Sequence, residues 1–180
     1  MKILKESNLK EIINYINQNK IIILPTDTQI AVICKDEKKI YALKKRNSNK
    51  KLIKFIYNYK SENFSENFSK LANHFWPGPL TLIENKISYR IPNNNLLISI
   101  LKEVDFVYSS SANISGEEPL QNTMDYQTLF QNNILKNEIV IIEGKSNELL
   151  PSSIYNLDQM KLIRKGKISL DEIEKILNLN

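Results

Sequence analysis

The chain has 180 residues, 42% of them hydrophobic, and a formal net charge of +5 at pH 7. Its single cysteine excludes an intrachain disulfide, its single histidine excludes a multi-histidine metal site, and its apolar runs are too short to span a membrane. The first residues also lack the apolar region of a signal peptide. We therefore expect one globular domain over residues 1–180, in a soluble and cytoplasmic protein with no membrane partner.

The hydrophobic period predicts alternating helices and strands along the chain. Ser7 is expected to cap a first helix, and a strand at 21–24 should end at Pro25. A second strand is expected at 29–34, and Asp36 should cap the short helix that follows it. The remaining predicted elements are a strand at 52–57, a helix at 65–75, strands at 80–84 and 87–91, a helix at 95–103, a strand at 105–109, a helix at 123–131, strands at 138–143, 153–157 and 161–164, and a closing helix from Ser169.

Two of these strands are close enough to form a hairpin. Residues 80–84 and 87–91 are separated only by Asn85-Lys86, a dipeptide that lacks the glycine of the best two-residue turns. Other strands are separated by helices, which is typical of crossover connections. The mixture predicts an α/β fold, namely a single-domain, open, twisted, mixed β-sheet flanked by helices.

Arginine is rare in this chain. Of 25 basic side chains only three are arginines: Arg46, Arg90 and Arg164. A planar guanidinium matches phosphate or carboxylate oxygens with two parallel hydrogen bonds, which an ammonium cannot do. These three residues are therefore the first candidates for anion-binding positions. The alternative is that they occur by chance in a lysine-rich chain and have no special role.

Residues 44–54 form a basic segment that contains six cationic side chains and no acid. Nucleotide phosphates or an RNA backbone could bind to it, and a merely solvated segment is the alternative. The chain has no GxGxxG or Walker A pattern. If it binds a nucleotide, it does so with an architecture other than the two commonest phosphate loops.

Seven short segments carry a family resemblance that covers nearly the whole chain. They are LPTDT at 24–28, LKKRNSNKKL at 43–52, FWPGPLTL at 75–82, YRIP at 89–92, SSSANISG at 109–116, PSSI at 151–154 and LIRKGKIS at 162–169. With these segments in this order, the chain resembles the YrdC/TsaC family of threonylcarbamoyl-AMP synthases, in the short bacterial form. The resemblance implies a YrdC-like fold whose concave, positive face holds the substrates.

The implied activity is that of a nucleotidyltransferase. Such an enzyme joins L-threonine, bicarbonate or CO2, and ATP to give threonylcarbamoyl-AMP and pyrophosphate, with Mg²⁺ on the ATP phosphates. The product would supply a downstream tRNA threonylcarbamoyl transferase complex, and direct contact of the basic segment with tRNA is left open. The chemistry needs cations and hydroxyls that orient two anions rather than a dedicated nucleophile.

The resemblance also implies a set of site residues. ATP would be bound by Lys44, Arg46, Lys50, Asn113 and Arg164. Hydroxyls around the threonine and its carbamate would come from Thr28, Ser111 and one of Ser152 or Ser153, with Arg90 as partner of the amino acid's carboxylate. No catalytic residue and no protein-bound metal ion is assigned.

The chain departs from the family pattern in three places, one of which is Phe55, where some relatives carry a threonine-contacting histidine. After PTDT the family continues with Val-Tyr-Gly-Leu, where this chain has Gln29, Ile30, Ala31 and Val32, and both prolines of the family's KxRPxxKP loop are replaced. These changes concern the shape of the threonine pocket and the stiffness of the phosphate loop. Two alternatives therefore stay open: an RNA-binding YrdC-like module without synthase activity, and a related enzyme acting on another carbamoyl adenylate.

Overall fold

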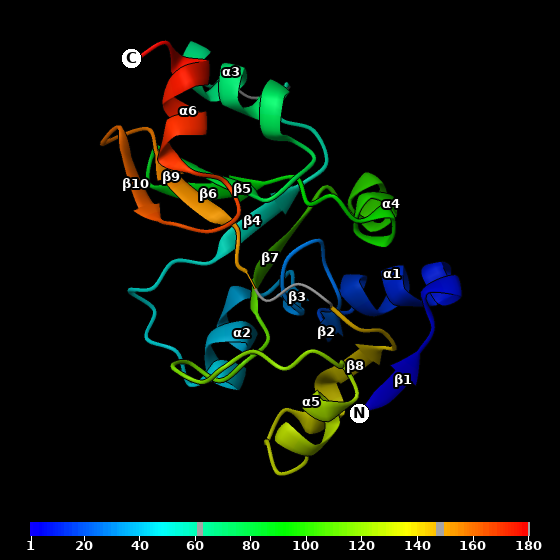
Figure 1. The fold of residues 1–180 in the computed structure, drawn as a ribbon. Helices are drawn as coiled ribbons and strands as arrows, with labels where there is room; N and C mark the ends of the chain where they lie inside the picture. The colour runs from blue at the N-terminus through cyan, green and yellow to red at the C-terminus, as the bar shows by residue number, and fades with distance from the viewer. Residues whose placement is uncertain (61–62, 147–149, 180) are drawn as a thin grey trace.

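The computed structural model describes residues 1–60, 63–146 and 150–179. Its strands form one mixed sheet in the order β1-β8-β2-β3-β7-β4-β6-β5-β9-β10 (Figure 1). The strands are β1 (Lys2–Leu4), β2 (Ile21–Leu24), β3 (Ala31–Cys34), β4 (Ile53–Ile56), β5 (Leu80–Glu84), β6 (Ile87–Arg90), β7 (Phe106–Ser111), β8 (Ile139–Ile142), β9 (Ser153–Asn156) and β10 (Lys161–Arg164). The helices are α1 (Leu9–Asn17), α2 (Glu37–Lys44), α3 (Glu66–Phe75), α4 (Asn95–Val104), α5 (Asp125–Leu129) and α6 (Leu170–Leu177), with 3₁₀ turns η1 (Glu6–Asn8) and η2 (Lys136–Glu138).

The sheet is mixed, as predicted. Strand β8 pairs in parallel with β1 and β2, β4 with β6, and β5 with β9. The remaining pairs, β2-β3, β3-β7, β4-β7, β5-β6 and β9-β10, are antiparallel. This pairing confirms the open mixed sheet.

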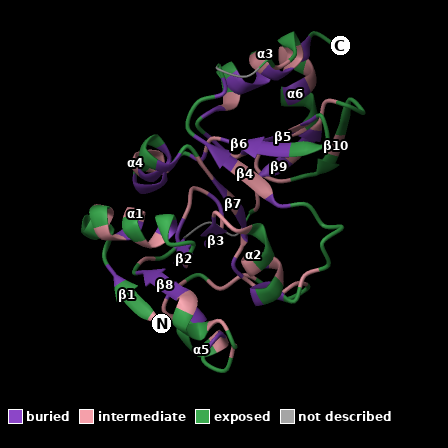
Figure 2. Cartoon of the chain, turned by 180° about the vertical axis from the view of Figure 1, so that it is seen from behind, coloured by how far each residue is buried: buried purple, intermediate pink, exposed green. Residues whose placement is uncertain are grey.

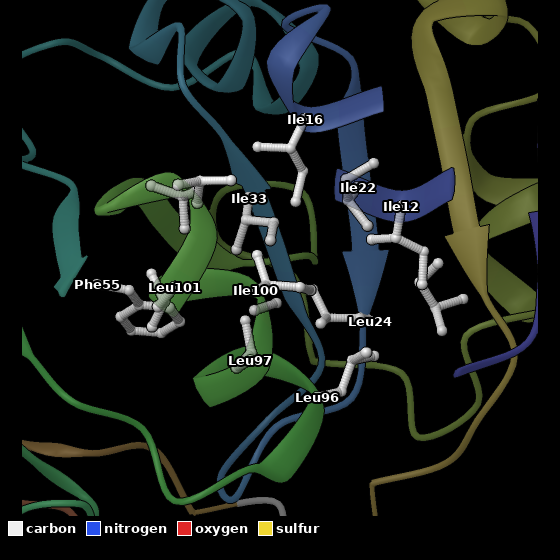
Figure 3. Close-up of a cluster of buried hydrophobic side chains, with 14 of the residues drawn as sticks. Ile12, Ile16, Ile22, Leu24, Ile33, Phe55, Leu96, Leu97, Ile100 and Leu101 are labelled. Carbon is white, nitrogen blue, oxygen red and sulfur yellow. The ribbon is translucent and has the colours of Figure 1, made fainter. Parts of the chain in front are cut away.

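Helices cover both faces of the sheet, because its central strands are apolar on both sides. Ile22 and Leu24 pack with helices α1 and α4, whereas Ile21 and Ile23 belong to a second cluster with residues of α2 and α5. Figure 3 shows the first cluster, in which side chains of α1 and α4 converge on β2 and β3. Helices α3 and α6 pack on a third cluster over β5 and β9. The buried residues therefore follow the strands and the inner sides of the helices (Figure 2).

Most predicted elements are present, and local chemistry explains their ends. Asp36 caps α2, with its side chain accepting a hydrogen bond from the Lys38 N–H at 3.0 Å. Ser169 caps α6 in a capping box with Glu172. The expected helix at 123–131 is shorter than predicted, because only Asp125–Leu129 is α-helical. Trp76 is a buried residue whose Nε1 donates to the Leu80 carbonyl at 2.6 Å.

Two local predictions need correction. Ser7 does not cap the first helix: it lies inside η1, where the Lys5 N–H donates to the Asn8 side chain at 3.0 Å and the chain enters α1 without a side-chain cap. Strand β1 was not predicted. It has only three residues, and its partner β8 lies far along the chain, so no local sequence pattern predicts it. Among the described residues, no helix has the length and apolarity needed to cross a membrane.

Candidate active site

A polar cavity lies where β4, β7 and β9 meet the loops before β3 and after α2. Six of the seven motif segments contribute to its lining, and the seventh, FWPGPLTL, supplies a carbonyl behind it. The lining residues are Thr26, Thr28, Gln29, Ala31, Arg46, Lys51, Ile53, Phe55, Arg90, Ser109, Ser110, Ser111, Pro151, Ser152, Ile154 and Arg164. Segments that are far apart in the sequence are thus brought to one place by the sheet order.

All three arginines of the chain line this cavity. Burial lowers the pKa of the Arg164 guanidinium, and the positive charges of Arg90 and Arg46 lower it further. Arginine keeps its proton even after such shifts, so three cations remain in one cavity. Their convergence favours a ligand with several negative oxygens.

Arg46 follows α2 and is held by its own loop. Its Nε donates to the Lys50 carbonyl at 3.1 Å, its Nη1 to Ser110 Oγ at 3.2 Å and its Nη2 to the Lys51 carbonyl at 3.1 Å. A guanidinium has five N–H hydrogens, so two remain for a ligand. The loop therefore orients the guanidinium before any anion binds.

Arg90, at the end of β6, is only 2% exposed and forms the buried side of the cavity. Its Nη2 makes an ion pair with Asp27 Oδ1 at 2.6 Å, its Nη1 donates to Thr28 Oγ1 at 3.1 Å, and its Nε donates to the Gly78 carbonyl at 2.9 Å. Burial lowers the pKa of Arg90, and the Asp27 carboxylate opposes this shift. Arg90 thus fixes the Thr28 hydroxyl at the cavity wall.

Arg164, at the end of β10, is joined to the loop before β9. Its Nε donates to the Ser152 carbonyl at 3.0 Å and its Nη2 to Ser152 Oγ at 3.1 Å. Gly166 permits this approach: a Cβ atom there would lie 2.3 Å from the Pro151 carbonyl oxygen and 2.5 Å from the Ser152 carbonyl carbon. A side chain at position 166 would push the loop that carries Ser152 away.

Other residues named from the resemblance lie outside the lining. Lys44 is 1% exposed, and its ammonium contacts serine oxygens of β7. Lys50 is an exposed residue of the basic loop, and Asn113 lies just after β7, where its Nδ2 donates to the Ile114 and Glu117 carbonyls. The Asn113 Oδ1 atom is buried and has no hydrogen-bond partner among the residues that the structure describes.

The structure also separates the two serines of the PSSI segment. Ser152 lines the cavity, whereas Ser153 is fully buried and its hydroxyl contacts Gly166 and Ile168. Ser111 lines the cavity beside Ser110. Of the four residues that replace Val-Tyr-Gly-Leu after PTDT, Gln29 and Ala31 line the cavity, whereas Ile30 and Val32 are buried in the core cluster of α2 and α5. The lost tyrosine thus corresponds here to a core position.

Sequence reasoning missed five lining residues with polar side chains: Thr26, Gln29, Lys51, Ser109 and Ser110. Two signals were present, since Ser109 and Ser110 belong to the quoted SSSANISG segment and Lys51 to the basic segment. Side chains of a strand alternate between the two faces of the sheet, but this alternation alone does not show which serine of β7 contacts a cation. The cations belong to Lys44 in α2 and Arg46 in the following loop, so the contacts depend on how α2 packs against β7.

No cluster of three or more His, Cys, Asp or Glu side chains occurs in the described ranges 1–60, 63–146 and 150–179. In the same ranges, Asp27 Oδ2 is a buried acceptor without a hydrogen-bond partner, but Asp27 is not among the lining residues. Magnesium bound mainly by nucleotide phosphates and water would need no such cage.

The Sua5/YciO/YrdC family model, described as telomere recombination, matches residues 14–166. The chain belongs to this family. It is 32% identical over 180 residues to the uncharacterized protein MG259 homolog of Mycoplasma pneumoniae, and this match covers 98% of the chain and 39% of that relative. The chain thus spans about two fifths of that relative's length.

Relatives with a named activity are less similar. The threonylcarbamoyl-AMP synthase of Wigglesworthia glossinidia brevipalpis is 28% identical over 196 residues, which cover 92% of the chain and 97% of that enzyme. The fold is that of Pyrococcus abyssi Sua5, solved in complex with L-threonine, with a TM-score of 0.83 at 24% identity over 98% of the chain and 59% of Sua5. Escherichia coli YciO gives a TM-score of 0.77 at 17% identity, covering 96% of the chain and 97% of YciO. These likenesses confirm the predicted fold of the family.

Proposed function

We propose that the chain is an L-threonylcarbamoyladenylate synthase, which makes threonylcarbamoyl-AMP and pyrophosphate from L-threonine, bicarbonate or CO2, and ATP. The observation that carries the proposal is the meeting of Arg46, Arg90 and Arg164 with serine and threonine hydroxyls in one cavity. The relatives with a named activity are threonylcarbamoyl-AMP synthases, which supports the same assignment.

In the proposed reaction the protein orients two anions. The threonine amine adds to CO2 and loses a proton, which gives a carbamate. A carbamate oxygen then forms a bond to the α-phosphorus of ATP, and the bond from that phosphorus to the bridging oxygen breaks, so that pyrophosphate leaves. Fixed donors that neutralise the developing charge suit this chemistry.

We assign Arg46 and Arg164, which both line the cavity, to the nucleotide. Both guanidinium groups keep N–H hydrogens that their protein contacts leave unused, and Lys50 lies in the same basic loop as Arg46. We also assign Asn113 to the nucleotide: it follows β7, and its Oδ1 is a buried acceptor that lacks a hydrogen-bond partner among the described residues. Magnesium would be bound by the phosphates and would shield their charge.

We assign the amino acid to the side formed by Thr28, Arg90, Ser111 and Ser152. Arg90 supplies a positive charge for the carboxylate from behind the Thr28 hydroxyl. Ser152 rather than Ser153 takes the role expected of the PSSI segment, because only Ser152 lines the cavity. The product would pass to a tRNA threonylcarbamoyl transferase complex.

A related enzyme with another amino acid substrate is the second candidate. Gln29 and Ala31 line the cavity where the family pattern has valine and glycine, so the pocket wall differs in polarity and volume. An RNA-binding module without synthase activity is the third, and the basic segment favours it.

One assay separates the three candidates. The protein is mixed with MgATP and bicarbonate, with L-threonine, with L-serine or with no amino acid, and pyrophosphate is measured while mass spectrometry follows the AMP adduct. Threonine-dependent pyrophosphate release together with the threonylcarbamoyl adduct of AMP supports the proposal. Release with serine, or without any amino acid, supports the related enzyme. Salt-sensitive RNA binding without turnover supports the binding module.

A further inference from the structure

The hydroxyl of Ser110 is enclosed by two cations. Its Oγ lies 3.0 Å from Lys44 Nζ and 3.2 Å from Arg46 Nη1. Ammonium and guanidinium groups only donate, so both lone pairs of this oxygen are occupied. The hydroxyl hydrogen is then the only polar function left on Ser110, and within the described part of the chain it has no acceptor. Ser110 lines the cavity.

Lys44 has no hydrogen to spare for a ligand. Its ammonium contacts Ser110 Oγ at 3.0 Å, Ser111 Oγ at 3.4 Å and the Ser111 carbonyl at shorter range. These three oxygens match the three N–H hydrogens of a lysine. Lys44 is also 1% exposed and does not line the cavity. Its influence on a bound ligand must therefore pass through the serines.

We propose that Ser110 donates its hydroxyl hydrogen to a phosphate oxygen of the nucleotide, and that Lys44 is a positioning residue that holds this hydroxyl in the donating direction. The inference rests on the proposed function in taking the anion to be a phosphate. A phosphate is favoured over a carboxylate because Arg46 contacts the same hydroxyl and keeps two N–H hydrogens beside it. Three neighbouring donors match a group with several negative oxygens.

The charges around Ser110 support this assignment. Lys44 makes no ion pair with an acid within the ranges 1–60, 63–146 and 150–179. Burial, followed by the charge of Arg46, lowers the pKa of Lys44 to about 7. A buried cation without a counter-ion is costly, and a bound oxyanion would supply the missing negative charge.

The test measures anion affinity directly. Isothermal titration calorimetry with inorganic pyrophosphate and with MgATP is applied to the wild type, Ser110→Ala and Ser110→Thr. Loss of a hydrogen bond to a charged group should weaken both affinities by about tenfold or more in Ser110→Ala. Ser110→Thr keeps the hydroxyl and should restore affinity. Ser88→Ala is the matched control, because Ser88 is a buried strand serine, 7% exposed, outside the lining of this cavity.

A double-mutant cycle then shows whether Lys44 acts through Ser110. Lys44→Met should weaken pyrophosphate binding in the wild type, and by a smaller factor in the Ser110→Ala background. Equal factors in the two backgrounds would mean that Lys44 contacts the anion itself, which overturns the positioning role. Unchanged pyrophosphate affinity in Ser110→Ala, or a wild type that binds no pyrophosphate, overturns the whole inference.

A further outcome would show which substrate accepts the hydrogen bond from the Ser110 hydroxyl. If Ser110→Ala weakens L-threonine binding and leaves pyrophosphate binding intact, the donor faces the amino acid and the phosphate assignment is wrong. Pyrophosphate binding requires neither threonine nor turnover. A protein that binds pyrophosphate through Ser110 but forms no threonylcarbamoyl-AMP would therefore retain this inference while the proposed function fails.

Discussion

Arg46 is oriented by two carbonyls of its own loop and by Ser110, which sets it apart from the lysines around it. A lysine at this position carries the same charge, but its single ammonium cannot reach both carbonyls and still present two hydrogens to a phosphate. Charge alone therefore does not describe what this residue contributes to the proposed site.

We expect Arg46→Lys to lower kcat/KM for MgATP by about tenfold or more, since a charge-assisted hydrogen bond contributes about 1.5–3 kcal/mol. Pyrophosphate release under threonine saturation measures this effect. Lys38→Ala is the control, because it removes an exposed charge from α2 outside the cavity and should leave kcat/KM unchanged. Wild-type turnover in Arg46→Lys would contradict the role of the guanidinium.

The three arginines could be selected from the sequence because their scarcity and chemistry are visible there. The roles of Lys44 and Ser110 could not, because they depend on which atoms meet between α2 and β7. Lys44 and Ser110 are 66 residues apart in the chain and lie 3.0 Å apart in space. Motif spacing shows that a lysine is present, but only the packing shows that its hydrogens are used within the protein.

At the scale of elements, the β5–β6 hairpin shows how a missing glycine is compensated. Asn85 and Lys86 both have positive φ, at 53° and 64°, which is the conformation that favours glycine. Their backbone N–H groups donate to the Asp158 carboxylate at 2.8 and 2.9 Å. The acid comes from the turn after β9, so the two hairpins stabilise each other.

We expect Asp158→Ala to lower the free energy of unfolding by about 1–3 kcal/mol, since two backbone donors lose a charged acceptor. For a chain of this size that corresponds to a decrease in Tm of roughly 2–4 °C per kcal/mol. Asp158→Asn keeps one acceptor oxygen, so its Tm should lie between those of the wild type and Asp158→Ala. Lys86→Gly should instead raise the Tm, because glycine adopts positive φ without strain. Thermal unfolding followed by circular dichroism measures all four proteins, and an unchanged Tm in Asp158→Ala would show that solvent replaces the carboxylate.

Element types were predictable where a local signal was strong. Caps such as Asp36 and Ser169 and the apolar run of β2 mark their elements without tertiary information. The signals failed where stability comes from distant partners. Strand β1 exists because β8 pairs with it, and Ser7 is part of a 3₁₀ turn that leads into α1. Short elements of this kind are determined by packing rather than by propensity.

At the scale of the whole molecule, the fold gathers positive charge in one cavity whose lining residues include three arginines and no acid. Within the described ranges, Asp27 is the only acid in an ion pair with any of the three arginines. The buried ammonium of Lys44 adds to this excess. Such an arrangement destabilises the free protein, and a bound anion offsets the cost by binding only the folded state.

This cost should be visible as a pH dependence of stability. The folded-state pKa of Lys44 is lowered to about 7, whereas an unfolded lysine titrates near 10.4. Between these values the unfolded state binds more protons, so the contribution of Lys44 to the free energy of unfolding rises with pH and is smallest below pH 7. Lys44→Met removes this dependence.

We therefore expect the stability of the wild type relative to Lys44→Met to increase by up to about 2 kcal/mol between pH 7 and pH 9. Urea unfolding at several pH values measures the difference, and the other titrating groups cancel because both proteins share them. Saturating pyrophosphate should reduce the difference, since an anion near Ser110 raises the pKa of Lys44. A difference that stays constant over this range would mean that Lys44 keeps its proton in the free protein, so that the serine oxygens and solvent already stabilise its charge.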